Sequence, residues 1–113
     1  TALNCCQQIL PRMKLVGWGR IINMGAQAAT KGMPLAGPYC TSKIAVHALT
    51  KIIALENGGS ITCNAIVPGI IDTPYNRMQM QGADHSNWVG SGKIAKKIEG
   101  LLLSDENGAL IRL

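Results

Sequence analysis

Arg20-Ile21-Ile22-Asn23-Met24 is a short run rich in apolar residues, and the longer run Ser60–Val67 has the same character. Such runs favour β-strands, and the Pro68-Gly69 pair that follows the second run is a strong stop signal. Between the two runs, the segment from Tyr39 to Glu56 has the composition of a helix. A strand, a helix and a second strand in this order predict two parallel strands joined by a helical crossover.

The segments on either side continue the alternation of helices and strands. Residues 1 to about 15 carry an apolar stripe at helical spacing, and Pro11 inside it is expected to kink the helix or remove one hydrogen bond. Ser91 is expected to cap a helix that ends near Leu103, and Ala109–Leu113 is expected to form the last strand. The order of elements therefore predicts an α/β fold with a parallel sheet. Two segments without a periodic pattern are expected to be irregular, residues 25–38 and 70–90.

The charge pattern and the hydropathy exclude several classes of partner. The chain has eleven Lys and Arg against six Asp and Glu, but the basic residues are scattered and Phe is absent. A nucleic-acid surface needs clustered basic residues or stacking aromatic residues, so no nucleic-acid partner is expected. No apolar run reaches the ~18 residues that suggest a bilayer span, so no membrane partner is expected either.

The four cysteines and two histidines show no metal-binding spacing. No pair of cysteines forms a C-x-x-C motif, and the adjacent Cys5 and Cys6 are poorly placed to form a disulfide with each other. His47 and His85 have no further ligand at a suitable spacing. We therefore expect no metal site, and reduced cysteines in a cytoplasmic protein.

Tyr39 and Lys43 are the residues most suited to acid–base chemistry. They are four residues apart at the start of the predicted helix, so their side chains share one face. An ammonium group close to a tyrosine favours the phenolate and so lowers the tyrosine pKa towards the range where proton transfer is efficient. The same spacing occurs by chance in many helices, so an ordinary surface pair is the alternative interpretation.

Three linked segments of the chain resemble the short-chain dehydrogenase/reductase family. These segments are the strand Arg20–Asn23 with its Gly- and Ala-rich loop, the helix opening Pro38–Lys43, and the strand and loop Ile61–Pro74. The resemblance covers essentially the whole chain. It implies a partial doubly wound Rossmann fold, with residues 1–113 as the C-terminal half of a single NAD(P)-binding domain and the N-terminal half absent from this chain.

The resemblance also implies an oxidoreductase that passes a hydride between NAD or NADP and a carbonyl-like or imine-like carbon of a small-molecule substrate. Tyr39 would be the general acid/base at the substrate oxygen. Lys43 would bind the nicotinamide ribose and lower the Tyr39 pKa. Together with Tyr39 and Lys43, the implied cofactor-binding residues are Pro68, Gly69, Ile71 and Thr73.

One position departs from the family pattern. The family usually has a serine thirteen residues before the tyrosine, and Ala26 stands there in this chain. The stretch Gly25–Ala29 is similar to that of the dihydropteridine reductases, a branch that works without this serine. Ala26 and Gln27 are therefore expected to line the substrate pocket, with Gln27, Thr30 or a water molecule donating the missing hydrogen bond. The alternative is a non-catalytic binding or assembly subunit that keeps the fold.

Three further expectations concern the rest of the protein. The phosphate-binding turn and the residue that separates NAD from NADP belong to the first half of such domains, so this half leaves the preference open. In the family, the helices at residues 1–15 and 39–56 often pack against a second subunit, and a homodimer or homotetramer is expected. Ser104–Asn107 runs straight into Gly108 where relatives have a longer connection, so we expect missing residues between Asn107 and Gly108.

Overall fold

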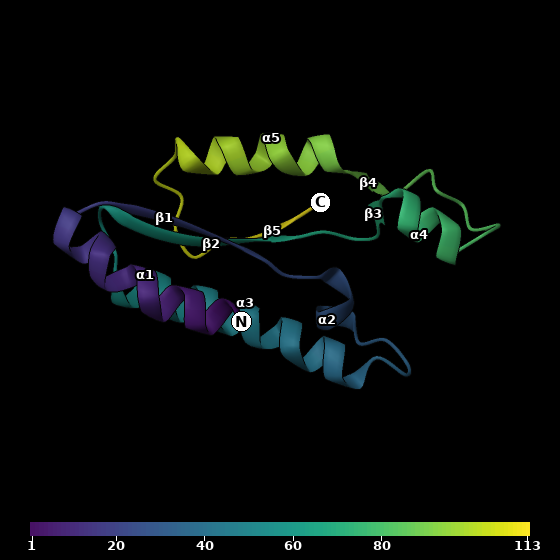
Figure 1. Ribbon diagram of the computed structural model, residues 1–113, viewed down its shortest axis with the longest axis horizontal. Coiled ribbons are helices and arrows are strands. Elements are labelled where there is room, and N and C mark those ends of the chain that lie inside the picture. The colour runs from purple at the N-terminus through teal and green to yellow at the C-terminus, as the bar shows by residue number, and fades with distance from the viewer.

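The computed structural model describes all residues from 1 to 113, and its centre is a sheet of three strands. The strands are β1 (Gly19–Met24), β2 (Ile61–Val67) and β5 (Leu110–Arg112), in the spatial order β1-β2-β5 (Figure 1). Both pairs of neighbouring strands are parallel. β2 lies in the middle and is buried along its whole length, as expected for a parallel strand covered on both faces. The predicted α/β fold with a parallel sheet is confirmed.

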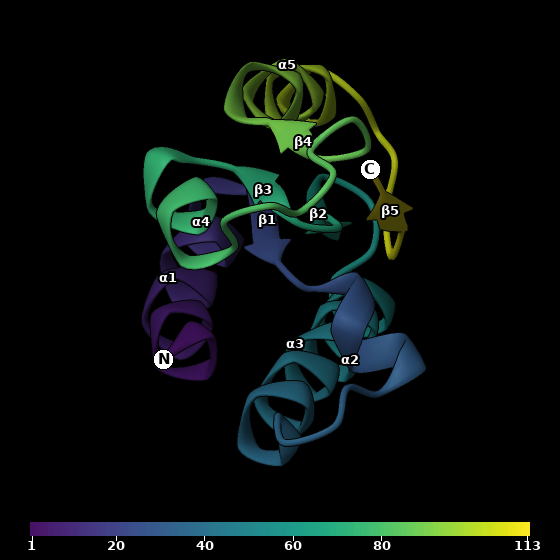
Figure 2. The same cartoon turned by 90° about the vertical axis from the view of Figure 1, so that its right-hand side faces the viewer.

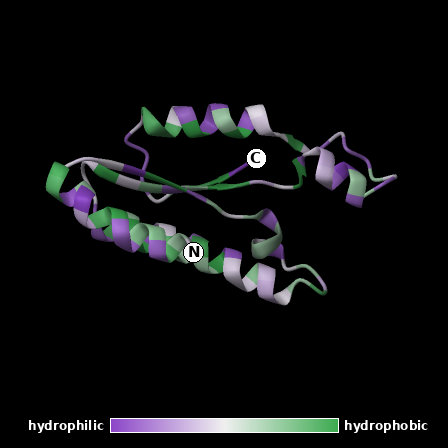
Figure 3. Ribbon diagram, viewed as in Figure 1, coloured by the Kyte–Doolittle hydropathy of each residue, from purple (hydrophilic) through white to green (hydrophobic).

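Helices cover both faces of this sheet, as in a doubly wound fold (Figures 1 and 2). α1 (Ala2–Val16) and α3 (Gly37–Glu56) lie on one face, and α5 (Ser91–Leu102) lies on the other. Figure 3 shows polar and apolar segments alternating along α5, as expected for a helix with one face on the sheet. The chain is thus a layer of helices, a sheet, and a further helix.

Each face of the sheet has its own hydrophobic core. Burying an Ile or Leu side chain contributes about 1.5–3 kcal/mol, so both cores stabilise the fold. The core beneath α1 and α3 contains Cys6, Ile21, Ile53, Ala54 and Cys63. The core beneath α5 contains Ile66, Val89, Ile94 and Leu101.

The predicted helix boundaries agree closely with the structure. Pro38 lies in the first turn of α3, where its missing N–H is not needed, and α3 stops at Asn57. The Asn57 side chain donates a hydrogen bond to the Ile53 carbonyl at 2.9 Å. α1 continues through Pro11 and ends at Gly17, whose φ of 74° suits glycine.

Two segments expected to be irregular contain short regular elements. Residues 25–38 include α2 (Gln27–Lys31). Residues 70–90 include α4 (Pro74–Gln79) and two strands, β3 (Ile71–Asp72) and β4 (Val89–Gly90), which pair in parallel as a small second sheet. Elements of two to six residues carry too few residues to show a period, so the sequence pattern missed them.

One other expectation is corrected. Ser91 is the first residue of α5 and not its cap, because Gly90 occupies the N-cap position. The expectation of missing residues between Asn107 and Gly108 stays a prediction, and both residues bind Cys63. The Asn107 side-chain oxygen accepts a hydrogen bond from the Cys63 N–H, and the Gly108 N–H donates to the Cys63 carbonyl, both at 2.9 Å. Gly108 lies in the connection Leu103–Ala109 between α5 and β5, and its φ of 78° is in the left-handed region that favours glycine.

α3 keeps apolar residues on a face that the sheet does not cover. His47, Thr50, Ile53 and Ala54 are its buried residues. Its exposed large apolar side chains are Ile44, Ile52 and Leu55. The apolar character on several sides of this helix is therefore only partly explained by packing within the chain.

Candidate active site

The carboxyl ends of the three parallel strands meet at one edge of the sheet. β1 leads into Gly25-Ala26-Gln27, β2 leads into Pro68-Gly69, and β5 leads into Leu113. In open α/β sheets, ligands bind in the crevice outside these strand ends. The turns at this edge are therefore the place to look for a functional site.

Hydrogen bonds tie the turns of this edge into one unit. The Gln27 N–H donates to the Pro68 carbonyl at 2.9 Å, and the Gly69 N–H donates to the Leu113 carbonyl at 3.1 Å. The Gln27 side-chain amide donates to the same Leu113 carbonyl at 2.8 Å. The sequence prediction placed Gln27, Pro68 and Gly69 in one site, and the structure brings these three residues together.

Lys43 reaches this edge from α3. Its Nζ donates a hydrogen bond to the Met24 carbonyl, at the last residue of β1, with a distance of 2.9 Å. An ammonium group has three donors, so two remain available to a ligand. The Lys43 side chain is therefore anchored at the end of β1 while keeping donors free.

Tyr39 lies one turn before Lys43 on the same helix and is 47% exposed. The Ser42 hydroxyl donates to the Tyr39 carbonyl at 2.8 Å, but no hydrogen bond of the structure uses the Tyr39 hydroxyl. Tyr39 is thus partly exposed, and its hydroxyl has no partner within the chain.

Ala26 leaves the turn after β1 without a side-chain donor. It is buried, and its backbone N–H donates to the Nε2 of His47 at 3.3 Å. Gln27 and Thr30 are the two residues expected to replace the missing serine hydroxyl. The Thr30 hydroxyl donates a hydrogen bond to the Gln27 carbonyl at 2.8 Å. The Gln27 amide has one N–H left after its bond to Leu113, whereas the one hydroxyl proton of Thr30 is directed at the Gln27 carbonyl in this structure.

The other predicted cofactor-binding residues occupy different surroundings. Pro68 is buried and Gly69 is exposed at the sheet edge. Ile71 is half-buried in β3 and lies opposite Val89. The Thr73 hydroxyl accepts a hydrogen bond from the Asn76 N–H at 3.1 Å and so caps α4. Ile71 and Thr73 therefore lie along the segment that leads away from the sheet edge towards α4.

His47 is the residue of this region that the sequence analysis missed. Its spacing of four residues from Lys43 and eight from Tyr39 was a usable signal, because it places all three on one helix face. Burial lowers the pKa of His47 below its ordinary value of 6.5, and the positive charges of Lys43 and Lys51 lower it further. The ring is therefore a neutral hydrogen-bond acceptor for Ala26 at physiological pH.

The sheet edge fits the nicotinamide end of a dinucleotide. Lys43 offers two free donors there, and Gly69 is exposed with no side chain. A Cβ built on Gly69 would lie 3.9 Å from the Gln27 side chain and from the Leu113 carbonyl, which is ordinary van der Waals contact. No group of three or more His, Cys, Asp or Glu side chains that could hold a metal ion is present, and no helix is long and apolar enough to cross a membrane.

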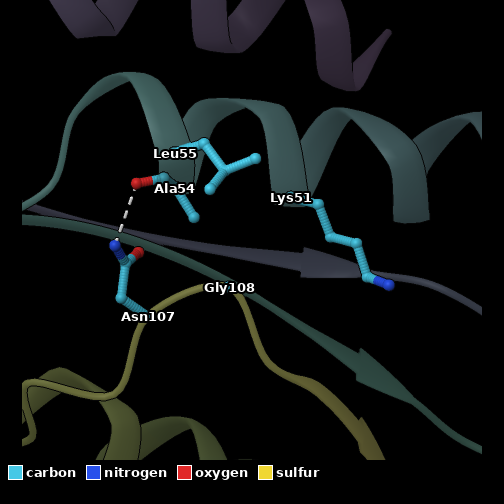
Figure 4. Close-up of a pocket in the computed structure, with 5 residues that line it drawn as sticks. All are labelled: Lys51, Ala54, Leu55, Asn107 and Gly108. Carbon is cyan, nitrogen blue, oxygen red and sulfur yellow. Dashed lines mark hydrogen bonds between the residues drawn. The ribbon is translucent and has the colours of Figure 1, made fainter.

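A separate hollow of about 310 Å³ lies at the other end of α3. Figure 4 shows its lining residues, which are Lys51, Ala54, Leu55, Asn107 and Gly108. The Asn107 side chain donates to the Ala54 carbonyl at 3.0 Å, and so holds the connection before β5 against the helix. None of the predicted site residues lines this hollow, which lies between α3 and the connection before β5.

Residues 1–84 match the family model described as short chain dehydrogenase. The chain belongs to the short-chain dehydrogenase/reductase family. The 2-(R)-hydroxypropyl-CoM dehydrogenase of Xanthobacter autotrophicus is 42% identical over 76 residues, which cover 66% of this chain and 30% of that enzyme. The 3beta-hydroxysteroid dehydrogenase of Mediterraneibacter gnavus is 34% identical over 110 residues, which cover 86% of this chain and 40% of the relative. The chain thus spans less than half the length of these family members.

Solved structures of short-chain dehydrogenases have the same fold. A gluconate 5-dehydrogenase from Burkholderia cenocepacia, in complex with NADP and tartrate, matches 99% of this chain with a TM-score of 0.85 and 26% identity. The structure of ElxO with NADP bound matches 98% of the chain with a TM-score of 0.84 and 26% identity. The chain covers 49% and 51% of these two structures. These matches confirm the partial Rossmann fold predicted from the sequence.

Proposed function

We propose that the protein is an NAD(P)-dependent oxidoreductase in which Tyr39 is the general acid/base and Lys43 assists it. Membership of the short-chain dehydrogenase/reductase family supports this proposal, as do the dehydrogenase names of its relatives. The observation that carries it is the Lys43–Met24 bond, because it anchors the lysine at the sheet edge with Tyr39 one turn away. Two groups suited to proton transfer would therefore face the crevice where ligands of such sheets bind.

In this proposal, each residue of the pair has a separate task. For reduction, the Tyr39 hydroxyl gives its proton to the substrate oxygen as that oxygen gains negative charge, and it recovers a proton from solvent. For oxidation, the Tyr39 phenolate takes the proton from the substrate hydroxyl. The Lys43 ammonium stabilises the phenolate in both directions by its positive charge. A nicotinamide dinucleotide, when bound, supplies or accepts the hydride.

The cofactor would be held at the carboxyl ends of β1 and β2. Lys43 would donate to its ribose, and Pro68, Gly69, Ile71 and Thr73 would line its nicotinamide end. The NADP-bound structures that match this chain support a nicotinamide dinucleotide as the cofactor. Thr73 could contribute its hydroxyl proton while continuing to accept the Asn76 N–H, because a hydroxyl both donates and accepts.

The substrate side of the pocket would be formed by Ala26 and Gln27. With no hydroxyl at position 26, the substrate oxygen would rely on Tyr39, on the free N–H of Gln27 or on a water molecule. Removing one preorganised donor from an oxyanion hole costs about 10²–10³ in rate, which sets the scale of this loss. The proposal therefore favours substrates whose reduction needs few hydrogen-bond donors at the substrate oxygen, including pterins with an imine-like carbon.

A second candidate function follows from the same observation. Without a side-chain donor at Ala26, the protein could keep the fold as a non-catalytic binding or assembly subunit. The Tyr39 hydroxyl favours the enzyme, because it has no hydrogen-bond partner within the chain, and Lys43 favours it because two of its three donors remain free beside the Met24 carbonyl. Only turnover decides between the two candidates.

The experiment uses the full-length protein with NADH or NADPH. It is mixed with a panel of ketones, aldehydes and quinonoid dihydropterins, and cofactor oxidation is followed at the nicotinamide absorbance. Consumption of one cofactor with one substrate class supports the oxidoreductase. Tight binding of a cofactor with no turnover across the panel would favour the non-catalytic subunit.

A further inference from the structure

The His47 ring lies directly beneath the turn that follows β1. The side chain comes from the middle of α3, one turn after Lys43, and the residue is only 4% exposed. Its Nε2 accepts the hydrogen bond of the Ala26 N–H at 3.3 Å. A side chain of α3 therefore holds the backbone at the position where the family usually has its serine.

Gly25 provides the space that the ring needs. A Cβ built on Gly25 would lie 2.2 Å from His47 Nε2 and 2.6 Å from its Cδ2, far inside contact distance. The backbone conformation does not explain the glycine, because Gly25 is not among the residues with positive φ. A side chain at position 25 would therefore collide with the imidazole, so Gly25 and His47 fit each other.

The hydrogen bond to Ala26 defines which form of the ring is present. Since Nε2 accepts, the proton of the neutral imidazole is on Nδ1, which is buried and has no partner in the chain. Protonation would add an N–H at Nε2, the ring's second, which would face the N–H of Ala26. The hydrogen bond between Ala26 and His47 would then be lost. Only the neutral ring can hold this turn.

We propose that His47 is the positioning residue of the substrate-side turn, and that it acts only as the neutral imidazole seated on Gly25. This role rests on the proposed oxidoreductase function, in which the turn at Ala26 and Gln27 lines the pocket beside the substrate oxygen. With no side-chain donor at Ala26, the backbone of this turn and Gln27 are what the protein presents on that side. A misplacement of about 1 Å can cost about 100-fold in rate, so the anchoring of the turn matters.

The charges around the ring keep it neutral. Lys43 and Lys51 are the charged groups that act on His47, both from α3, and both disfavour the imidazolium. The residues that face the ring across the gap, Gly25 and Ala26, carry no charge. The pKa of His47 is therefore below 6.5, and the anchor is expected to fail only in acid.

The kinetic test compares two substitutions in the full-length enzyme. His47→Leu removes the acceptor, whereas His47→Gln keeps an amide oxygen that can accept the Ala26 N–H and does not titrate. We expect His47→Leu to lower kcat/KM by about 10- to 100-fold and His47→Gln to retain most of it. We also expect kcat/KM of the unmodified enzyme to fall below pH 6.5 and this fall to be absent in His47→Gln. Equal activity in all three proteins, with the same acid limb, would overturn the inference.

A second measurement does not depend on turnover. In the unmodified protein, nitrogen NMR should show the His47 ring as the neutral Nδ1–H form at pH 7.5, and the Ala26 amide should exchange slowly with solvent. Gly25→Ala should displace the ring and speed exchange at Ala26, as His47→Leu does. A protein with no oxidoreductase activity but a protected Ala26 amide would refute the proposed function and keep the anchor. A rapidly exchanging Ala26 amide in an active enzyme would refute the anchor alone.

Discussion

Lys43 and His47 lie one helical turn apart on α3, and their side chains bind the backbone on either side of Gly25, at the end of β1. Lys43 donates to the carbonyl of Met24, and His47 accepts the N–H of Ala26. The helix that carries Tyr39 is therefore joined to the end of β1 by two side-chain hydrogen bonds on one face. This arrangement couples the position of the proposed acid/base to that of the substrate-side turn.

The turn between α5 and β5 should depend on the side chain of Asn107. That side chain accepts the Cys63 N–H at 2.9 Å and donates to the Ala54 carbonyl at 3.0 Å. Asn107→Ala leaves the buried Cys63 N–H without a partner, which is expected to cost about 1–3 kcal/mol of unfolding free energy. Urea denaturation measures this. The matched control is Glu106→Ala, whose side chain makes no hydrogen bond, and a similar loss in both variants would refute the role of Asn107.

The four thiols should differ widely in reactivity. Cys5 is exposed, whereas Cys63 is fully buried and its pKa is raised by burial to about 12. Because the thiolate is the reactive species, iodoacetamide at pH 8 is expected to modify Cys5 quickly and Cys63 only after unfolding. Peptide mass spectrometry gives the extent at each site. Modification of Cys63 in the folded protein at the rate of Cys5 would show that the core around β2 opens readily.

The paired strands and long helices could be predicted from sequence because each contains its own signal. The run Arg20–Met24 and the stop at Pro68-Gly69 are local features, and the structure places β1 and the end of β2 at those positions. β3 and β4 have two residues each, and they exist only because Ile71 pairs with Val89 across a long loop. No local pattern contains that information.

The candidate site was predicted less completely than the fold. Tyr39 and Lys43 followed from their spacing and from the family resemblance, and their catalytic role remains a prediction. The spacing of His47 places it on the face of Tyr39 and Lys43, but the sequence does not show that its partner is the Ala26 N–H. Its contact with Ala26 depends on how α3 packs against the end of β1, and this tertiary packing is not encoded in the local sequence pattern.

Acid should weaken the folded protein through His47. Its pKa is lowered by folding, so between the native value and about 6.5 the unfolded chain binds more protons than the native state. The contribution of the neutral ring is therefore fully present above about pH 6.5 and lost as the pH falls towards the native pKa. Unfolding free energies from pH 5 to 7.5 should decrease towards acid, with a smaller slope in His47→Gln. Parallel curves for the two proteins would contradict this.

The uncovered face of α3 predicts self-association. Ile52 and Leu55 are 50% and 85% exposed, although both are large apolar residues in a helix. We expect the full-length protein to be a homodimer or homotetramer, and Ile52→Glu to shift it towards the monomer by placing a charge in the interface. Light scattering at micromolar concentrations reads the mass directly. A monomer mass for the unmodified protein would refute this prediction, and Lys97→Glu on α5 serves as the charge control.

The proposed oxidoreductase depends on proton transfer by Tyr39, and the kcat of Tyr39→Phe in the full-length protein measures that dependence. The substitution removes only the hydroxyl, which makes no hydrogen bond within the chain, so circular dichroism and the unfolding midpoint should be unchanged. General acid–base catalysis contributes about 10²–10⁴-fold to a rate, so kcat should fall by about 10²-fold or more. Tyr75→Phe, at the chain's other tyrosine, should keep normal turnover. Near-normal turnover in Tyr39→Phe would contradict the account.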